Sequence, residues 1–283
     1  GFTYNYQYVH MASLSALSLP TDVWFPSTSR VKPQKGWQVS TGYFQNLFDN
    51  KYEGSVEIYY KNLQNMIAYK DGALPQETVK DNVDSQLTFG QGYSYGIELF
   101  FKKRVGKLTG WIGYTWSQTM RQFDELNDGE WFPAKYDRRH DLSIVASYEL
   151  NEQWSFGATF VYATGNALTM PTGRYFLEGN IINEYGPRNG FRMPAYHRMD
   201  ISVTWKDKAI KIKKDKETGE TIEKKRKFRN SVNLSVFNVY NRANPFFIYL
   251  DNEGSISEGS IDVTAKQVSL FPILPSITWN FEF

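Results

Sequence analysis

The sequence predicts an all-β fold, a transmembrane antiparallel β-barrel. Ten segments alternate apolar and polar residues with a period of two, which is typical of strands with one lipid-facing and one water-facing side. Aromatic residues make up 17% of the 283 residues, yet the mean hydropathy is only −0.51. No segment approaches the roughly 18 apolar residues that a membrane-spanning helix needs. Alternation explains this combination, because it halves the average hydrophobicity of a strand that still crosses the bilayer.

The ten predicted strands repeat one pattern along the chain. They cover about residues 1–11, 36–46, 52–64, 91–104, 108–120, 138–149, 153–163, 196–213, 222–240 and 266–283. The residues assigned to the lipid-facing side are, in chain order, Phe2, Tyr4, Tyr6, Tyr8; Trp37, Val39, Thr41, Tyr43; Val56, Ile58, Tyr60; Tyr93, Tyr95, Ile97, Leu99, Phe101; Leu108, Ile112, Tyr114, Trp116; Leu142, Ile144, Ala146, Tyr148; Trp154, Phe156, Ala158, Phe160, Tyr162; Met199, Ile201, Val203, Trp205; Val232, Leu234, Val236; and Ile277, Trp279, Phe281, Phe283. Aromatic residues recur toward both ends of these strands, as in the aromatic girdles of membrane barrels.

The connections between the predicted strands alternate in length. Those at about 47–51, 105–107 and 150–152 are short, and those at about 12–35, 65–90, 121–137, 164–195 and 241–265 are long. Outer-membrane barrels have short periplasmic turns and long extracellular loops. This alternation predicts a first strand that runs outward and a C-terminus in the periplasm.

One connection on the expected periplasmic side is long and basic. Residues 206–229 contain eleven Lys or Arg residues against five acidic ones. We expect a hairpin that extends beyond the membrane, with a turn near Gly219. It is either a solvated charged hairpin or a contact for lipid headgroups or a periplasmic partner.

Composition and motif spacing argue against several functions. The formal net charge of +2 gives no reason to expect nucleic acid as a partner. The chain contains no cysteine, which excludes disulfides and thiolate chemistry. Its three histidines, His10, His140 and His197, show no metal-ligand spacing. We therefore expect no catalytic, cofactor-binding or metal-binding residues and no enzyme activity. Because the chain begins at Gly1 without Met, we expect it to be part of a longer protein.

Seven motifs, in this order and spacing, resemble the C-terminal half of a TonB-dependent outer-membrane receptor. They are Lys32-Pro-Gln-Lys-Gly-Trp37, Tyr52-Glu-Gly-Ser-Val-Glu-Ile-Tyr-Tyr60, Gly96-Ile-Glu-Leu-Phe100, Gly110-Trp-Ile-Gly-Tyr-Thr-Trp-Ser117, Tyr136-Asp-Arg-Arg-His-Asp141, Tyr196-His-Arg-Met-Asp200 and Phe237-Asn-Val-Tyr-Asn-Arg-Ala-Asn-Pro245. The resemblance covers essentially residues 1–283 and is closest to the branch with an N-terminal carboxypeptidase-like regulatory domain.

The resemblance implies the architecture and partners of the whole receptor. The family has a barrel of 22 strands filled by an N-terminal plug, so residues 1–283 would supply the last ten strands, without the plug and the earlier strands. The implied function is energised uptake of a peptide, glycan or metal chelate across the bacterial outer membrane. The implied partners are membrane lipid, the plug and N-terminal strands, a TonB-type energy-coupling protein and the barrel assembly machinery, and a surface lipoprotein partner is left open. A passive porin-type channel or a structural surface barrel (an adhesin) remains the alternative.

Three groups of residues are candidates for function. The terminal aromatics Trp279, Phe281 and Phe283 resemble the signal that the assembly machinery recognises. Arg138 and Asp141, with Arg139 between them, and the pair Arg198 and Asp200 start predicted strands, so they either form ion pairs on the wall or contact plug and ligand. The long loops carry aromatic and arginine residues that either bind ligand or pack on one another: Trp131, Phe132, Arg174, Tyr175, Phe176, Tyr185, Arg188, Phe191 and Arg192.

Overall fold

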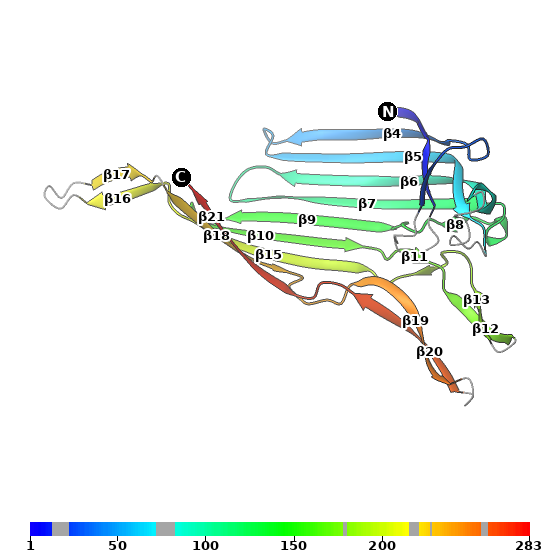
Figure 1. The fold of residues 1–283 in the computed structure, drawn as a ribbon. Coiled ribbons are helices and arrows are strands. Elements are labelled where there is room, and N and C mark those ends of the chain that lie inside the picture. Colours follow the sequence, from blue (N-terminus) through cyan, green and yellow to red (C-terminus); the bar gives the residue numbers. More distant parts are fainter. Residues whose placement is uncertain (13–22, 72–82, 178–179, 215–220, 227, 256–259) are drawn as a thin grey trace.

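The computed structural model describes residues 1–12, 23–71, 83–177, 180–214, 221–226, 228–255 and 260–283. Ten long strands in this part of the chain form one antiparallel, curved sheet (Figure 1). In their order of pairing, they are β1 (Phe2–Gln7), β4 (Gln34–Leu47), β5 (Tyr52–Tyr69), β6 (Leu87–Lys103), β7 (Leu108–Phe123), β9 (His140–Glu149), β10 (Trp154–Ala163), β15 (Tyr196–Lys206), β18 (Arg229–Phe237) and β21 (Leu274–Glu282). An eleventh, short strand, β8 (Phe132–Pro133), pairs with β7. The all-β prediction is confirmed. No helix in the described ranges is long and apolar enough to cross a membrane.

The strand register confirms the predicted division into an apolar and a polar face. Residues directly opposite each other on paired strands share a face. Ile58 pairs with Ile97, which pairs with Trp116. At the other side of the sheet Val203 pairs with Leu234. Rows of this kind continue through the sheet, so the apolar side chains of neighbouring strands lie on one surface.

Aromatic side chains occupy both ends of this apolar face. The rings of Tyr95 and Trp116 lie 5.7 Å apart near the middle of β6 and β7, on the loop side of Ile97 and Leu99. The rings of Tyr52 and Phe101 stack at 5.7 Å near the opposite ends of β5 and β6. Amphipathic rings at two levels, with aliphatic residues between them, match a bilayer core bounded by two interfaces.

The polar face departs from the prediction near the short turns. Phe100 pairs with Ser55 and with Gly113, which lie on the polar face, so Phe100 belongs to that face too. Its ring lies 6.0 Å from that of Trp111. Gly113 lies next to both rings, where an added Cβ would make ordinary contact with the Trp111 ring at 3.4 Å. The polar face therefore contains an aromatic patch that strict alternation does not predict.

Long and short connections emerge at opposite ends of the sheet, as predicted. The long connections fold into additional small hairpins that the sequence did not reveal (Figure 1). These pair β2 (Val9–Ala12) with β3 (Val23–Pro26), β11 (Ala167–Leu168) with β14 (Phe191–Arg192), β12 (Pro171–Leu177) with β13 (Asn180–Tyr185), and β19 (Pro245–Ser255) with β20 (Ser260–Ser269). Two 3₁₀ turns, Val83–Gln86 and Asn127–Gly129, lie in the same connections. We call this the loop end and the opposite side the turn end.

Two predicted strands at the ends of the chain are too long. The strand predicted at 1–11 ends at Gln7, because residues Val9–Ala12 turn away and pair with β3. The strand predicted from 266 begins at Leu274. Phe271 has a positive φ of 55°, a conformation that interrupts an extended chain.

The basic hairpin predicted at 206–229 is present at the turn end. β16 (Ile210–Lys214) pairs with β17 (Thr221–Lys225), so the strands predicted at 196–213 and 222–240 are each divided in two. Asp207 lies where β15 ends, before β16 begins. Its carboxylate accepts hydrogen bonds from the Asn230 amide at 3.0 Å and from Arg226 at 2.8 Å. The Asn230 amide lowers the pKa of Asp207, which keeps this anchor charged.

The sheet is open in the described part of the chain. β1 pairs only with β4, and β21 pairs only with β18. The outward side chains of β21 are highly exposed, with Ile277 at 71% and Trp279 at 63%. A bilayer does not tolerate unpaired strand edges. Closure by further strands and a total of 22 remain predictions.

Candidate functional site

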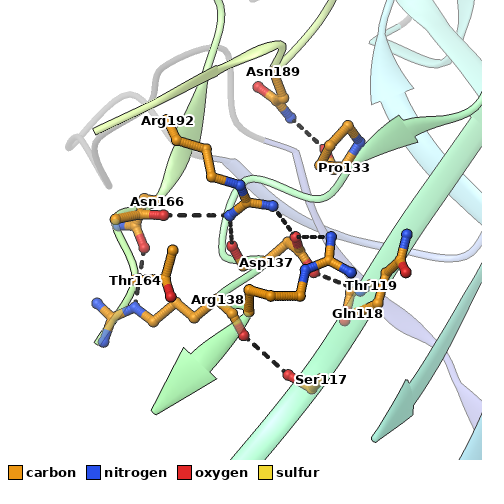
Figure 2. Close-up of polar contacts among 12 residues, drawn as sticks. Ser117, Gln118, Thr119, Pro133, Asp137, Arg138, Thr164, Asn166, Asn189 and Arg192 are labelled. Carbon is orange, nitrogen blue, oxygen red and sulfur yellow. Dashed lines mark hydrogen bonds and ion pairs between the residues drawn. The ribbon is translucent and has the colours of Figure 1, made fainter. Parts of the chain in front are cut away.

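A buried carboxylate organises the loop end. The side chain of Asp137, in the segment between β8 and β9, is 0% exposed. It accepts a hydrogen bond from the Thr119 amide at 2.6 Å and forms ion pairs with Arg192 and, at 3.4 Å, with Arg139. Figure 2 shows Thr119 of β7 and Arg192 of β14 converging on Asp137. We call these four residues the Asp137 cluster.

Local backbone contacts explain why Asp137 is buried. The segment before it turns with a hydrogen bond from the Asp137 amide to the Ala134 carbonyl at 2.9 Å. The Ala134 amide donates to the Thr119 carbonyl, also at 2.9 Å, so the segment continues the ladder along β7. The Arg192 guanidinium also donates to the Asp137 carbonyl at 2.5 Å and to the Gly165 carbonyl at 3.3 Å. Arg192 thereby connects the loop over residues 164–195 to the wall.

Gly165 allows this close approach of two loop strands. A Cβ at position 165 would lie 1.8 Å from the Met193 carbonyl oxygen, a separation that no side chain can adopt. The glycine is therefore required where residues 164–167 cross residues 192–194.

The predicted pair Arg138 and Asp141 is present but weak. Their charged atoms lie 4.0 Å apart, and both side chains are almost half exposed. Arg138 instead donates through Nε to the Asn166 side chain at 3.1 Å (Figure 2). Exposed pairs of this kind contribute little to stability, so these side chains are available for other contacts.

The predicted pair Arg198 and Asp200 is an internal contact of the wall. Their charged atoms are 2.9 Å apart. The Arg198 guanidinium also lies 4.0 Å from the centre of the Phe237 ring. Asp200 accepts the amide of Asn238, which is 1% exposed and has a φ of 54°. The pair therefore holds the point where β18 ends and the connection to β19 begins.

The predicted loop residues divide into packed and exposed sets. Phe132 is only 4% exposed and packs with Met66, Phe123 and Leu126. Arg188 lies 5.7 Å from the centre of the Phe132 ring and forms a 3.0 Å ion pair with Asp71. These contacts place Phe132 in the packing of the loop end.

The exposed set comprises Trp131 and residues of β12, β13 and β14. Trp131 is 37% exposed, with its ring 4.8 Å from that of Tyr93. Tyr175, Tyr185 and Phe191 are between 45% and 62% exposed. Arg174 is also exposed, on β12. The backbone of Phe176 lies on β12, and its side chain falls outside the described residues.

Arg121, on β7, is, like Asp137, a residue that the sequence did not single out as a functional candidate. It lies on the polar face, directly opposite Gly92 of β6 and Phe132 of β8. Its Nε atom is buried without a hydrogen-bond partner. In the sequence, Arg121 is only one arginine on the polar face of a strand. Such residues are common in barrels, so the sequence alone does not distinguish it.

The terminal aromatics form a ring cluster at the turn end. Phe283 is 94% exposed and Phe281 is 53% exposed. Phe228, which the sequence analysis did not include, lies 5.4 Å from the Phe283 ring and 6.2 Å from the Phe281 ring. Trp279 lies 5.6 Å from Phe281 and donates through Nε1 to the Asn230 side chain at 3.1 Å.

Among the described residues, no three His, Asp or Glu side chains gather closely enough to hold a metal ion. What the loop end offers is aromatic surface and guanidinium groups. Both suit noncovalent binding of a ligand.

A single-layer antiparallel sheet with one apolar face, two aromatic levels and elaborate loops at one end defines a sector of a transmembrane β-barrel. The sequence matches the family described as TonB dependent receptor-like, beta-barrel, over residues 2–241. The chain belongs to this family of TonB-dependent receptor barrels. A comparison with curated proteins gave no match.

Solved structures with the same fold are outer-membrane transport proteins. The ferric-catecholate import receptor Fiu from E. coli K12, in its closed form, is 13% identical, with a TM-score of 0.50 over 90% of this chain and 28% of Fiu. The FrpB iron transporter from Neisseria meningitidis is 15% identical, with a TM-score of 0.50 over 90% of this chain and 32% of FrpB. The outer membrane transporter YddB from Escherichia coli is 8% identical, with a TM-score of 0.52 over 91% of this chain and 33% of YddB. The chain thus spans no more than a third of the length of these transporters.

Proposed function

We propose that residues 1–283 form the C-terminal wall of an outer-membrane receptor that imports a scarce ligand by TonB-dependent active transport. The observation that carries the proposal is the match to the receptor-barrel family over residues 2–241, combined with strand faces that suit lipid on one side and water on the other. In the whole protein, additional strands would close the barrel between β1 and β21, and a plug would fill it.

The proposed orientation directs the loop end outward and the turn end toward the periplasm. Its support is the contrast between paired hairpins in the long connections and the short connections 48–51, 104–107 and 150–153. Ligand would meet the exposed aromatic and arginine side chains of the loop end. Two of the three transporters above are described as iron or ferric-catecholate importers, so an iron chelate is the first candidate to test, before peptides and glycans.

Uptake by the whole receptor is expected to depend on the energy-coupling protein. Cells that produce the receptor should accumulate a radiolabelled iron chelate, peptide or glycan from dilute solution, and deletion of the energy-coupling protein should abolish this accumulation. Uptake that is equal in both strains, and that rises linearly with ligand concentration, would instead indicate a passive channel. Surface binding without any accumulation would indicate an adhesin.

The ring cluster at the C-terminus is expected to act in assembly. Deleting Phe283 or replacing Phe228 with alanine should lower the amount of folded receptor in the outer membrane, because both changes disrupt the exposed rings offered to the assembly machinery. Phe48→Ala is the matched control, since Phe48 is also an exposed aromatic at the turn end, at 73%, and lies outside the cluster. The heat-modifiable band on gels measures folded receptor. A normal folded yield with lost uptake would contradict the assignment.

A further inference from the structure

Arg121 has an unusual environment for a charged side chain. It lies near the loop end of β7 and shares the polar face with Thr119, the residue whose amide Asp137 binds. Gly92 stands directly opposite on β6. A Cβ at Gly92 would lie 2.8 Å from the Met66 sulfur and 3.7 Å from Cγ of Arg121. The glycine thus provides the space in which the stem of Arg121 packs.

Four other arginines of the loop end lie close to a carboxylate. Arg139 and Arg192 share Asp137, Arg188 pairs with Asp71, and Arg138 lies 4.0 Å from Asp141. Arg121 forms no ion pair or side-chain hydrogen bond within the described ranges, and its Nε is a buried donor without an acceptor. A buried donor of a charged side chain that lacks an acceptor is destabilising, so we expect Arg121 to have a partner beyond the described residues.

Arg188 adds a second positive charge to the same location. It lies over the ring of Phe132, at 5.7 Å from the centre, and Phe132 is paired directly with Arg121. Arg121 and Arg188 therefore both lie beside Phe132. Of these two arginines, Arg188 has a carboxylate partner, Asp71.

We propose that Arg121, assisted by Arg188, binds a negatively charged oxygen group of the imported ligand, such as a carboxylate, a phosphate or a catecholate. This inference rests on the proposed function, and it narrows the ligand to an anion. Guanidinium groups bind such oxygens through paired, charge-assisted hydrogen bonds. Arg121 remains partly exposed on the polar face, so an anion that enters from the loop end reaches it, and the aromatic residues nearby contact the rest of the ligand.

The test uses the full-length receptor in detergent micelles, with inorganic phosphate as the probe. The midpoint of thermal unfolding is measured against phosphate concentration, while chloride holds the ionic strength constant. Wild-type receptor is expected to gain stability with phosphate. Arg121→Met should bind phosphate about ten-fold more weakly or worse, the loss expected for one charge-assisted hydrogen bond. Arg121→Lys, which keeps the charge but not the planar fork, should fall between them.

Arg104→Met is the matched control, because Arg104 is partly exposed at the turn end and pairs with Glu53 at 2.5 Å. It should respond to phosphate like wild type. Without phosphate, Arg121→Met should be at least as thermally stable as wild type, since it removes an unpaired charge. A phosphate response that survives Arg121→Met would overturn the proposal. So would a clear loss of stability in Arg121→Met without phosphate, because that result would reveal a carboxylate partner elsewhere in the receptor.

The site and the transport function fail in different ways. If phosphate binds through Arg121 while uptake proceeds without the energy-coupling protein, the anion site is supported and TonB-dependent transport is contradicted. If energised uptake holds and the phosphate response does not involve Arg121, the receptor function stands and the anion site is wrong.

Discussion

Replacing Asp137 with asparagine is expected to lower the free energy of unfolding by about 3–5 kcal/mol, the usual cost of removing one partner of a buried ion pair. The substitution keeps an oxygen that can accept the Thr119 amide, so the effect isolates the charge. Arg192 and Arg139 would lose their only carboxylate among the described residues. Denaturant titration of the full-length receptor in lipid vesicles measures the change, and hydrogen exchange should show faster opening of residues 164–195.

Asp141→Asn provides the comparison on the neighbouring strand. Asp141 lies 4.0 Å from Arg138, and its side chain is 49% exposed. Loss of such a pair should cost no more than about 1 kcal/mol. Equal effects of the two substitutions would show that the Asp137 cluster does not hold the loop end together.

Ile58→Arg on β5 is expected to destabilise the receptor by about 2–4 kcal/mol, the cost of a charged side chain on the lipid face near the middle of the bilayer. Ile58 lies between Tyr52 and Tyr60 and pairs with Ile97. Ser55→Arg on the same strand introduces the same side chain on the polar face, where it stays in water. It should therefore be clearly milder in a folding titration in lipid vesicles.

The two substitutions give opposite results if the faces are reversed. A larger cost at Ser55 than at Ile58 would mean that the polar face meets lipid. Equal costs would mean that neither face of β5 is buried in a membrane, which would contradict the transmembrane assignment.

The strands of the wall could be predicted because their physical signal is local. Each strand in a membrane barrel must direct apolar residues to lipid and polar residues to water. The alternation in Tyr93–Phe101 or Trp154–Phe160 can therefore be recognised within ten residues. Short turns explain the pairing at the turn end, since they allow only neighbouring strands to pair.

Strand ends were less predictable, because they depend on contacts with distant residues. Alternation continues past Lys206, and only the bonds from Asn230 and Arg226 to Asp207 show why the wall strand stops there. The hairpins of the loop end were missed for a related reason. They are short or lack regular alternation, and their pairing gains stability from packing on the wall.

The sequence predicted which types of residue occupy the loop end, but not how these residues contact one another. Arg192 was a candidate either for ligand binding or for packing within the loops, and the structure places it against Asp137, which lies 55 positions away in the sequence. An aspartate before a strand is indistinguishable from an ordinary turn residue until its partners are known. Arg121 was missed because a missing partner, unlike a present one, has no sequence signature.

The pairing order of the sheet has an evolutionary consequence. From β1 to β21, each wall strand pairs only with the wall strands immediately before and after it along the chain. Each hairpin is therefore a local unit that closes at little entropic cost. Duplication or loss of one hairpin changes the number of strands by two and leaves every other strand in its direction, with its loop on the same side. Because the diameter of a barrel grows with its number of strands, pores of different width can arise from such events while the ligand-binding side keeps its place.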